Sequence, residues 1–195
     1  MKKLLLCLAA AACIVSCNND KKTIENNAPQ IEAAPDFFPV TDYLKGQVAD
    51  LKTIGINPLK YTTINNKTDS VWLKPEEFDS AFAEFLHPEI DSSTMAAYFT
   101  ETKFFDQTLN TYTFTYEPKK SMPENMQVKR WDVYVDPETN RVKRIYIEKY
   151  APGMKEIQLS WQAGRNCKIV YITMDASGNQ VVGKEELIKW YFDGE

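Results

Sequence analysis

The chain has 195 residues, with 23 Lys and Arg against 27 Asp and Glu and a formal net charge of −4. This modestly acidic balance argues against a nucleic-acid partner, which needs a basic surface, and against electrostatic docking on anionic lipids. A single histidine and four cysteines also restrict the catalytic and metal chemistry that the chain can support.

Residues 1–16, MKKLLLCLAAAACIVS, have the pattern of an export signal. Two lysines, Lys2 and Lys3, precede an apolar run over residues 4–15. The run is too short to cross a bilayer as a helix, for which about 20 apolar residues are needed, and it has the length of a signal-peptide core. We therefore expect an exported protein.

The end of this run, IVSC at residues 14–17, resembles the lipobox of bacterial lipoproteins. The resemblance implies that Cys17 is the lipidated residue, that residues 1–16 are removed, and that acyl chains anchor the protein in a membrane. Asn18, rather than an aspartate, follows the cysteine, which favours the outer membrane and leaves open whether the protein faces the periplasm or the outside. The alternative is an ordinary signal peptide that is cleaved elsewhere and contains a cysteine by chance.

This processing also determines which cysteines remain as free thiols in the mature protein. Cys7 and Cys13 would leave with the signal, and Cys17 would carry lipid. Cys167 then remains as the only free thiol, which excludes an intrachain disulfide. Its context, NCKIVYI, indicates a buried and unreactive side chain in a strand.

The rest of the chain divides into a spacer and one domain. Residues 17–35 contain the lipidated cysteine and a polar, Asn-rich stretch with too few apolar residues to fold, so we expect a flexible spacer. Residues 36–195 are long enough for a single globular domain with a substantial core.

The first part of this domain carries helix patterns and two short strands. The spacing of Leu44, Val48 and Leu51 predicts a helix that begins near Thr41 and ends before Gly55. Further elements are expected as strands over residues 59–66 and 70–73, a helix over 75–86 and a weaker helix over 92–99.

From about residue 100 the hydrophobic period changes to two, which is typical of strands. The strands expected here are one over residues 108–117, a hairpin over 128–150, a second hairpin over 156–174, and a last strand over 180–192 whose mixed pattern indicates a bulge. The sequence thus predicts an α+β fold, in which two or three helices pack on one face of a C-terminal antiparallel meander of about six strands.

The hairpin over residues 128–150 has a register that the apolar pattern defines. A three-residue loop at residues 138–140, with Asn140 in the left-handed conformation, places Trp131 opposite Ile147 on one apolar face. A slip of one residue would put a charge on that face.

The opposite face of this hairpin is the candidate binding surface. It carries Arg130, Asp132, Tyr134, Arg144, Tyr146 and Glu148. In the same register Tyr134 lies opposite Arg144, and Asp132 lies opposite Tyr146. Aromatic rings beside charged hydrogen-bonding groups can bind a glycan, a peptide or a partner protein of the envelope. The alternative is a solvated sheet face with ordinary cross-strand pairs.

The sequence lacks the usual catalytic and metal signatures. The single histidine, His87, lies at the expected end of a helix, and with one free cysteine it leaves no zinc site of the usual type. No nucleophile elbow, Walker loop, dinucleotide-binding or calcium-loop motif occurs, so we expect neither a metal nor a cofactor. Adjacent acidic pairs, Glu76/Glu77 and Glu185/Glu186, cannot face each other across a cleft as a glycosidase dyad does.

These observations predict a non-catalytic, lipid-anchored envelope protein that binds a ligand or partner through its sheet face. One alternative is an envelope scaffold or assembly factor with no small ligand. Another is a hydrolase that uses carboxylates.

Overall fold

A single antiparallel sheet of nine strands is the main element of the structure, a computed structural model that describes residues 37–120, 122–123, 125–150, 153 and 156–192. The predicted signal peptide, Cys17 and the predicted spacer lie outside the described residues. None of the helices within these ranges is long and apolar enough to span a membrane.

The elements follow in chain order. The helices are α1 (Val40–Thr53), the 3-10 turn η1 (Pro75–Glu77), α2 (Phe78–Ala81), α3 (Ala83–Leu86) and α4 (Ser92–Met95). The strands are β1 (Leu59–Ile64), β2 (Lys67–Trp72), β3 (Phe99–Asp106), β4 (Thr111–Pro118), β5 (Val128–Val135), β6 (Val142–Lys149), β7 (Glu156–Gln162), β8 (Asn166–Met174) and β9 (Gln180–Lys189).

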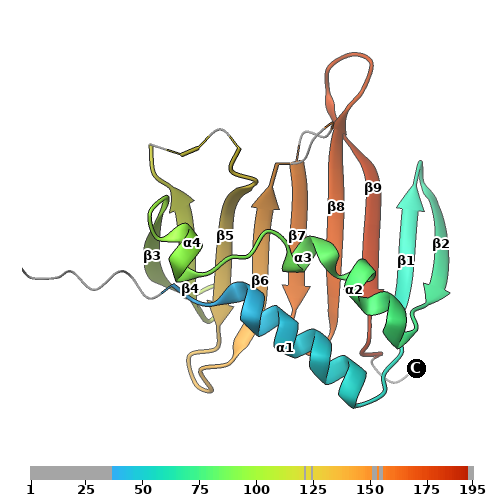
Figure 1. Ribbon diagram of the computed structural model, residues 1–195, viewed down its shortest axis with the longest axis horizontal. Coiled ribbons are helices and arrows are strands. Elements are labelled where there is room, and N and C mark those ends of the chain that lie inside the picture. Colours follow the sequence, from blue (N-terminus) through green and yellow to red (C-terminus); the bar gives the residue numbers. More distant parts are fainter. Residues whose placement is uncertain (1–36, 121, 124, 151–152, 154–155, 193–195) are drawn as a thin grey trace, which may run out of the picture. The chain divides into compact units, whose positions relative to one another are not determined.

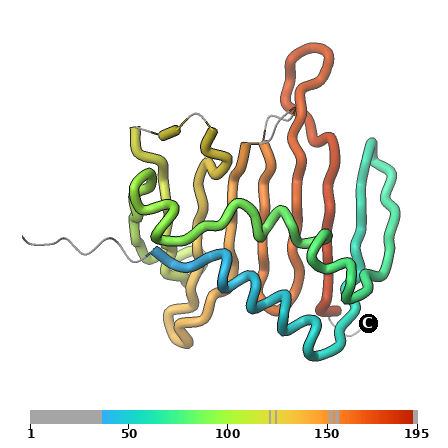
Figure 2. The backbone as a smooth tube through the Cα atoms, viewed as in Figure 1, coloured from blue at the N-terminus to red at the C-terminus, as the bar shows by residue number. Residues whose placement is uncertain are grey.

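The strands from β3 to β9 form an uninterrupted meander, each pairing with its neighbour in sequence. The early strand β1 then pairs with β9, and β2 lies outside it, which gives the order β2-β1-β9-β8-β7-β6-β5-β4-β3. Figure 2 shows the strands running up and down across the sheet in this order. Strands β2 and β3 are therefore the two edges.

All the helices cross the same face of the sheet (Figure 1), and the core lies between the two layers. Leu44, Val48 and Leu51 of α1 are buried there, as their spacing predicts. From the sheet, Trp131 and Trp161 are fully buried in the same core. Burial of such large aromatic side chains contributes strongly to stability because each removes much apolar surface from water.

The helical layer is smaller than predicted. The helix expected over residues 75–86 is divided into η1, α2 and α3, and the one expected over 92–99 is the single turn α4. The division falls at Phe82, whose backbone has φ −101° and ψ 5° and whose buried ring lies 5.6 Å from that of Trp161. The packing of this ring against the sheet accounts for the break in the helix. With so few helical residues, the fold is mostly β.

The sheet is larger than predicted, because the meander contains more than six strands. The strand that the sequence pattern missed is β3, which has one buried residue, Phe99, among eight. An edge strand with both faces exposed needs no alternation of apolar and polar residues, so it gives no period-two pattern. The two early strands, expected over residues 59–66 and 70–73, are confirmed as β1 and β2.

The register predicted for the β5–β6 hairpin is confirmed, with Trp131 opposite Ile147. Its loop is not the expected three residues: Asp136 N–H donates to the carbonyl of Arg141 at 2.8 Å, so four residues lie between them. A bulge at Lys143 takes up the difference, because Val135 pairs with Val142 while Tyr134 pairs with Arg144. The left-handed conformation of Asn140 is confirmed, with φ 55°.

The last strand, β9, contains the expected bulge. Tyr171 pairs with Lys184 and Ile172 pairs with Val182, so that Gly183 is the extra residue. A Cβ added at Gly183 would lie 3.0 Å from the Thr173 hydroxyl, which explains why a residue without a side chain stands at this position.

Candidate functional site

The sheet face opposite the described helices is called the open face below. Side chains alternate between faces along a regular strand, so the residues that alternate with the core residues of β5 to β8 project from this face. Trp131 and Val133 of β5 are buried on the helix side, and Tyr134 projects on the other. In β7, Leu159 and Trp161 are buried, and Ser160 lies on the open face.

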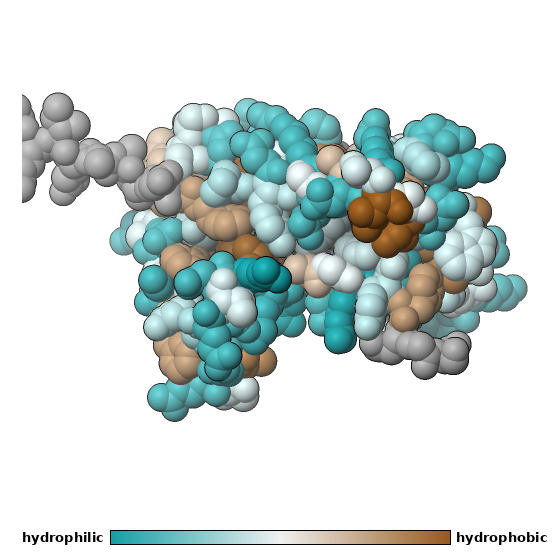
Figure 3. Space-filling view, turned by 90° about the horizontal axis from the view of Figure 1, so that it is seen from below, coloured by the Kyte–Doolittle hydropathy of each residue, from teal (hydrophilic) through white to brown (hydrophobic). Residues whose placement is uncertain are grey.

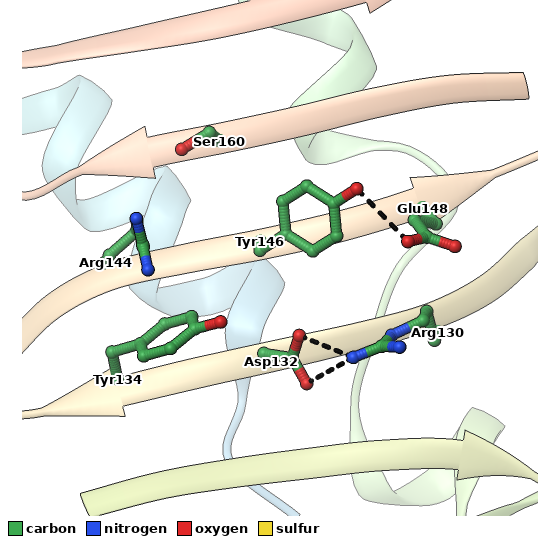
Figure 4. Close-up of a pocket in the computed structure, with 7 residues that line it drawn as sticks. All are labelled: Arg130, Asp132, Tyr134, Arg144, Tyr146, Glu148 and Ser160. Atoms are coloured by element: carbon green, nitrogen blue, oxygen red, sulfur yellow. Dashed lines mark hydrogen bonds and ion pairs between the residues drawn. The ribbon is translucent and has the colours of Figure 1, made fainter. Parts of the chain in front are cut away.

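The six predicted residues come together around one depression on the open face, called the central hollow (Figure 4). It has a volume of about 330 Å³. Its lining residues are Arg130, Asp132, Tyr134, Arg144, Tyr146, Glu148 and Ser160. Ser160 was not among the predicted residues, although the alternation in EIQLSWQ places it on the polar face of its strand. It joins the site because β6 and β7 pair with Tyr146 opposite Ser160.

Arg130 and Asp132 form an ion pair along β5. One guanidinium nitrogen, Nη2, lies 2.9 and 3.2 Å from the two carboxylate oxygens. Asp132 is only 3% exposed, so this charge is nearly excluded from water on an otherwise open surface. Within the described part of the chain, Arg130 Nε is buried and makes no hydrogen bond. The pair therefore fixes Asp132 and leaves a donor of Arg130 unused.

Tyr146 and Glu148 form a second pair, along β6. The Tyr146 hydroxyl donates to the Glu148 carboxylate at 3.1 Å, and Lys129 Nζ lies 3.5 Å from that carboxylate. Burial raises the pKa of Tyr146, and the charge of Glu148 raises it further. Tyr146 is therefore a neutral phenol across the physiological pH range and keeps its proton for hydrogen bonding.

Tyr134 and Arg144 form the third pair, across the two strands. The guanidinium carbon of Arg144 lies 4.3 Å from the centre of the Tyr134 ring, which is a cation–π geometry. Burial raises the pKa of Tyr134, and the nearby charge of Asp132 raises it further. Figure 4 shows the Tyr134 hydroxyl directed along its strand towards Asp132, with Arg144 beside the ring.

A second hollow, of about 210 Å³, adjoins the first at this pair. Its lining residues are Leu109, Thr111, Tyr134, Lys143, Arg144 and Gln162. Tyr134 and Arg144 line both depressions. The two hollows therefore lie side by side at this pair, and together they are called the groove below. Sequence reasoning missed the second hollow because Lys143 reaches it only through the bulge in β6.

The other residues considered from the sequence do not join this site. His87 is exposed at the end of α3. Cys167 is fully buried, and burial raises the pKa of its thiol well above the usual value. Glu185 and Glu186 lie on opposite faces of β9: Glu185 lines a separate hollow, and Glu186 is buried. Among the residues that the structure describes, no three His, Cys, Asp or Glu side chains are grouped as metal ligands would be.

Chemically, the groove is a hydrogen-bonding surface with aromatic rings. It offers phenol and serine hydroxyls, carboxylate oxygens and guanidinium donors around a hollow of small-molecule size. In Figure 4 the Tyr146 ring is seen face-on, between Ser160 and Asp132. Such a surface can hold a small polar ligand by hydrogen bonds and by contact with ring faces.

The chain has no significant match among protein-family models, curated proteins or solved structures.

Proposed function

We propose that this protein is a lipid-anchored, non-catalytic envelope protein that binds a small polar ligand, a glycan or a peptide, on its open face. The observation that carries the proposal is the convergence of Arg130, Asp132, Tyr134, Arg144, Tyr146 and Glu148 on one hollow. Concave sites with a few converging polar groups and aromatic side chains are the usual form of small-ligand sites.

The anchor is supported by the sequence IVSC, which ends the apolar run before Cys17. With acyl chains on Cys17, the domain would remain at a membrane, which we propose is the outer membrane, and the polar stretch to residue 35 would give it reach. The binding surface would then recognise a component of the cell envelope.

Binding is a better proposal than catalysis because the carboxylates of the hollow are occupied. Asp132 is held by Arg130 at 2.9 Å, and Glu148 accepts the Tyr146 hydroxyl. These pairings give both carboxylates a role within the protein, which supports binding over acid–base catalysis.

The test is a thermal-melt series on the full-length protein in detergent. The panel contains oligosaccharides, peptidoglycan fragments, fatty acids and peptides. A ligand at 100 times its Kd adds about 2.7 kcal/mol, which raises the melting temperature of a domain of this size by several degrees. Replacing both Tyr134 and Tyr146 by alanine should abolish the shift.

Tyr61→Ala is the matched control, because Tyr61 lines a different hollow on the sheet, with Thr63 and Glu185. It should leave the shift unchanged. A shift that survives the double replacement would show that the ligand binds elsewhere. No shift with any compound would remove the support for a small-ligand function.

One observation favours a second function, that of an envelope scaffold. On one face of the edge hairpin β3–β4, the rings of Phe105 and Tyr112 lie 5.3 Å apart and are 44% and 38% exposed, and Phe104, on the other face of β3, is 47% exposed. Apolar groups gathered on a surface often mark a protein interface. Photocrosslinkers at Phe104 and Phe105 in intact cells should capture a protein partner if this function is correct, and a crosslinker at exposed Lys67 on the opposite edge is the control.

Viewed from below, the surface is mostly polar, with separate apolar patches (Figure 3). Exposed apolar residues elsewhere include Ile54 at the end of α1 and the pair Trp72 and Phe192. Because these residues are scattered rather than continuous with the β3–β4 hairpin, they do not extend the proposed interface.

A further inference from the structure

The two hollows of the groove differ in charge. The central hollow is lined by two cations and two carboxylates, Arg130 and Arg144 with Asp132 and Glu148. The second hollow is lined by two cations, Lys143 and Arg144, and none of its lining residues in the described part of the chain is a carboxylate. Because Arg144 lines both hollows, its charge counts once: the rest of the central hollow carries one cation and two carboxylates, and the positive charge of the groove lies at the end with Lys143 and Arg144.

Arg144 is the cation at this end that lacks an ionic partner. Arg130 is paired with Asp132, and Lys143 lies 3.3 Å from the Asp136 carboxylate. Among the described residues, no carboxylate lies within ion-pair distance of Arg144, which rests on the Tyr134 ring instead. Arg144 as a whole is half-buried, so its charge is only partly screened by water.

We infer that the second hollow is a carboxylate-binding subsite, in which Arg144 is the main donor, and that the ligand of the groove is a short saccharide that carries a carboxylate. This inference rests on the proposed binding function of the open face. It adds the charge of the ligand, its chemical class and its orientation in the groove.

The net charge of the subsite matches one negative charge. Lys143 is already neutralised in part by Asp136, which leaves one uncompensated positive charge, on Arg144. A carboxylate carries one negative charge and presents two oxygens to the planar fork of an arginine. A phosphate monoester would bring close to two charges at neutral pH and would leave one uncompensated.

The neighbouring groups fit the rest of such a ligand. Gln162 and Thr111 line the second hollow with an amide and a hydroxyl, and Leu109 gives it one apolar side. The central hollow offers Tyr146 and Ser160 to an uncharged sugar ring, whose hydroxyls can both donate and accept hydrogen bonds. The acidic group would lie over Arg144, and the neutral part would lie over Tyr146.

The experiment measures binding to the full-length protein in detergent by calorimetry. The probes are a uronic-acid disaccharide, the same disaccharide with its carboxylates methyl-esterified, a sulfated disaccharide and a short peptide with a free C-terminal carboxylate. We expect the uronic-acid disaccharide to bind at least about tenfold more tightly than its ester, because a charge-assisted hydrogen bond is lost on esterification. This preference should weaken as salt is raised.

The variants separate the subsite from the whole face. Arg144→Gln should make the acid and the ester bind equally, and Arg144→Lys should restore part of the preference. Arg165→Gln is the matched control, because Arg165 also lies over a tyrosine ring, that of Tyr191 at 5.8 Å, and it lines neither hollow. It should change nothing.

Each outcome decides between the two proposals. Equal binding of acid and ester to the unmodified protein, abolished by the Tyr134 and Tyr146 replacements, overturns the carboxylate subsite and leaves the binding face intact. Tighter binding of the sulfated disaccharide or of the peptide overturns the assignment to a carboxylated saccharide. Binding of no probe at millimolar concentration overturns both the subsite and the saccharide function of the face.

Discussion

Lys149 of β6 donates hydrogen bonds to Glu84 of α3 twice, to its backbone carbonyl at 2.7 Å and to its carboxylate at 2.5 Å. The same ammonium donates to the carbonyl of His87 at 2.8 Å. The carbonyls of Glu84 and His87 lie at the C-terminal end of α3, where backbone carbonyls lack a partner within the helix. The Lys149 ammonium, which comes from the sheet, supplies the missing hydrogen bonds. Lys149 thus joins the two layers of the fold at a point where it is 5% exposed.

Replacing Lys149 with methionine should destabilise the protein, because it leaves two carbonyls without a donor. We expect the free energy of unfolding to fall by about 1–3 kcal/mol, measured by urea denaturation. Lys67→Met, on the exposed edge strand β2, is the control and should change it by less than about 0.5 kcal/mol. Equal effects of the two replacements would mean that the buried hydrogen bonds contribute nothing.

The ion pair between Lys60 and Glu186 should couple β1 to β9. Lys60 Nζ lies 2.6 Å from the carboxylate of Glu186, which is 6% exposed. Burial alone would raise the pKa of Glu186, but hydrogen bonds and charge from Lys60, with Lys184, outweigh it and hold that pKa below its usual value. Lys60→Met should therefore destabilise the protein, by about 1–3 kcal/mol.

A double-mutant cycle measures this coupling. The double variant Lys60→Met with Glu186→Met should be more stable than the sum of the single effects predicts, because no unpaired buried charge remains. Simple additivity in denaturant titrations would contradict the coupling.

The Asp136 side chain should make the β5–β6 turn sensitive to acid. Hydrogen bonds from the backbone N–H groups of Thr139 and Glu138, with Lys143 nearby, lower the pKa of Asp136 to about 2. Since the folded pKa lies below the unfolded value near 4, this carboxylate stabilises the fold above about pH 4, and the stabilisation is lost as the pH falls towards 2.

Asp136→Asn should therefore lower the melting temperature most at neutral pH, and the difference from the native protein should shrink as the pH falls from 4 to 2. Asp69→Asn, in the exposed strand β2, is the control, and its melting temperature should follow the native protein's across that range. A constant difference for Asp136→Asn at every pH would show that the charge is not what stabilises the turn.

The proposed anchor at Cys17 predicts a change in location. Cys17→Ser should abolish incorporation of labelled fatty acid and release the protein from the membrane fraction. Cys13→Ser, in the same apolar run, should leave both unchanged. Labelling and membrane retention of the Cys17→Ser protein would contradict the anchor.

The candidate site could be predicted because one hairpin has two unlike faces. Trp131 and Ile147 belong to an apolar set that fits the core in one register only, and that register places Tyr134 opposite Arg144. The loop between the strands nevertheless has one residue more than predicted. The bulge at Lys143 absorbs this extra residue, so the pairing of the strands beyond it is the predicted one. A hydrophobic pattern that fits the predicted pairing gives no sign of such a bulge.

Features that depend on contacts between distant segments could not be predicted. Ser160 belongs to the site only through the pairing of β6 with β7, which the sequence of neither strand specifies. The division of the helix at Phe82 depends on two tryptophans from the sheet, Trp161 and Trp190. The edge strand β3 has no buried face that would produce alternation.

The pairing of β1 with β9 has a consequence for the order of assembly. Leu59 pairs with Lys189, so β1 cannot join the sheet until β9, which lies far along the chain, has been synthesised. A polypeptide that emerges from a ribosome or a translocon with its N-terminal end first presents the β1–β2 hairpin long before its neighbour exists. The meander can form progressively by local hairpins, whereas the β1–β9 ladder closes a very long loop and is entropically costly. Docking of β1 should therefore be a late event in folding, which exposes this hairpin to proteases and chaperones until synthesis is almost complete.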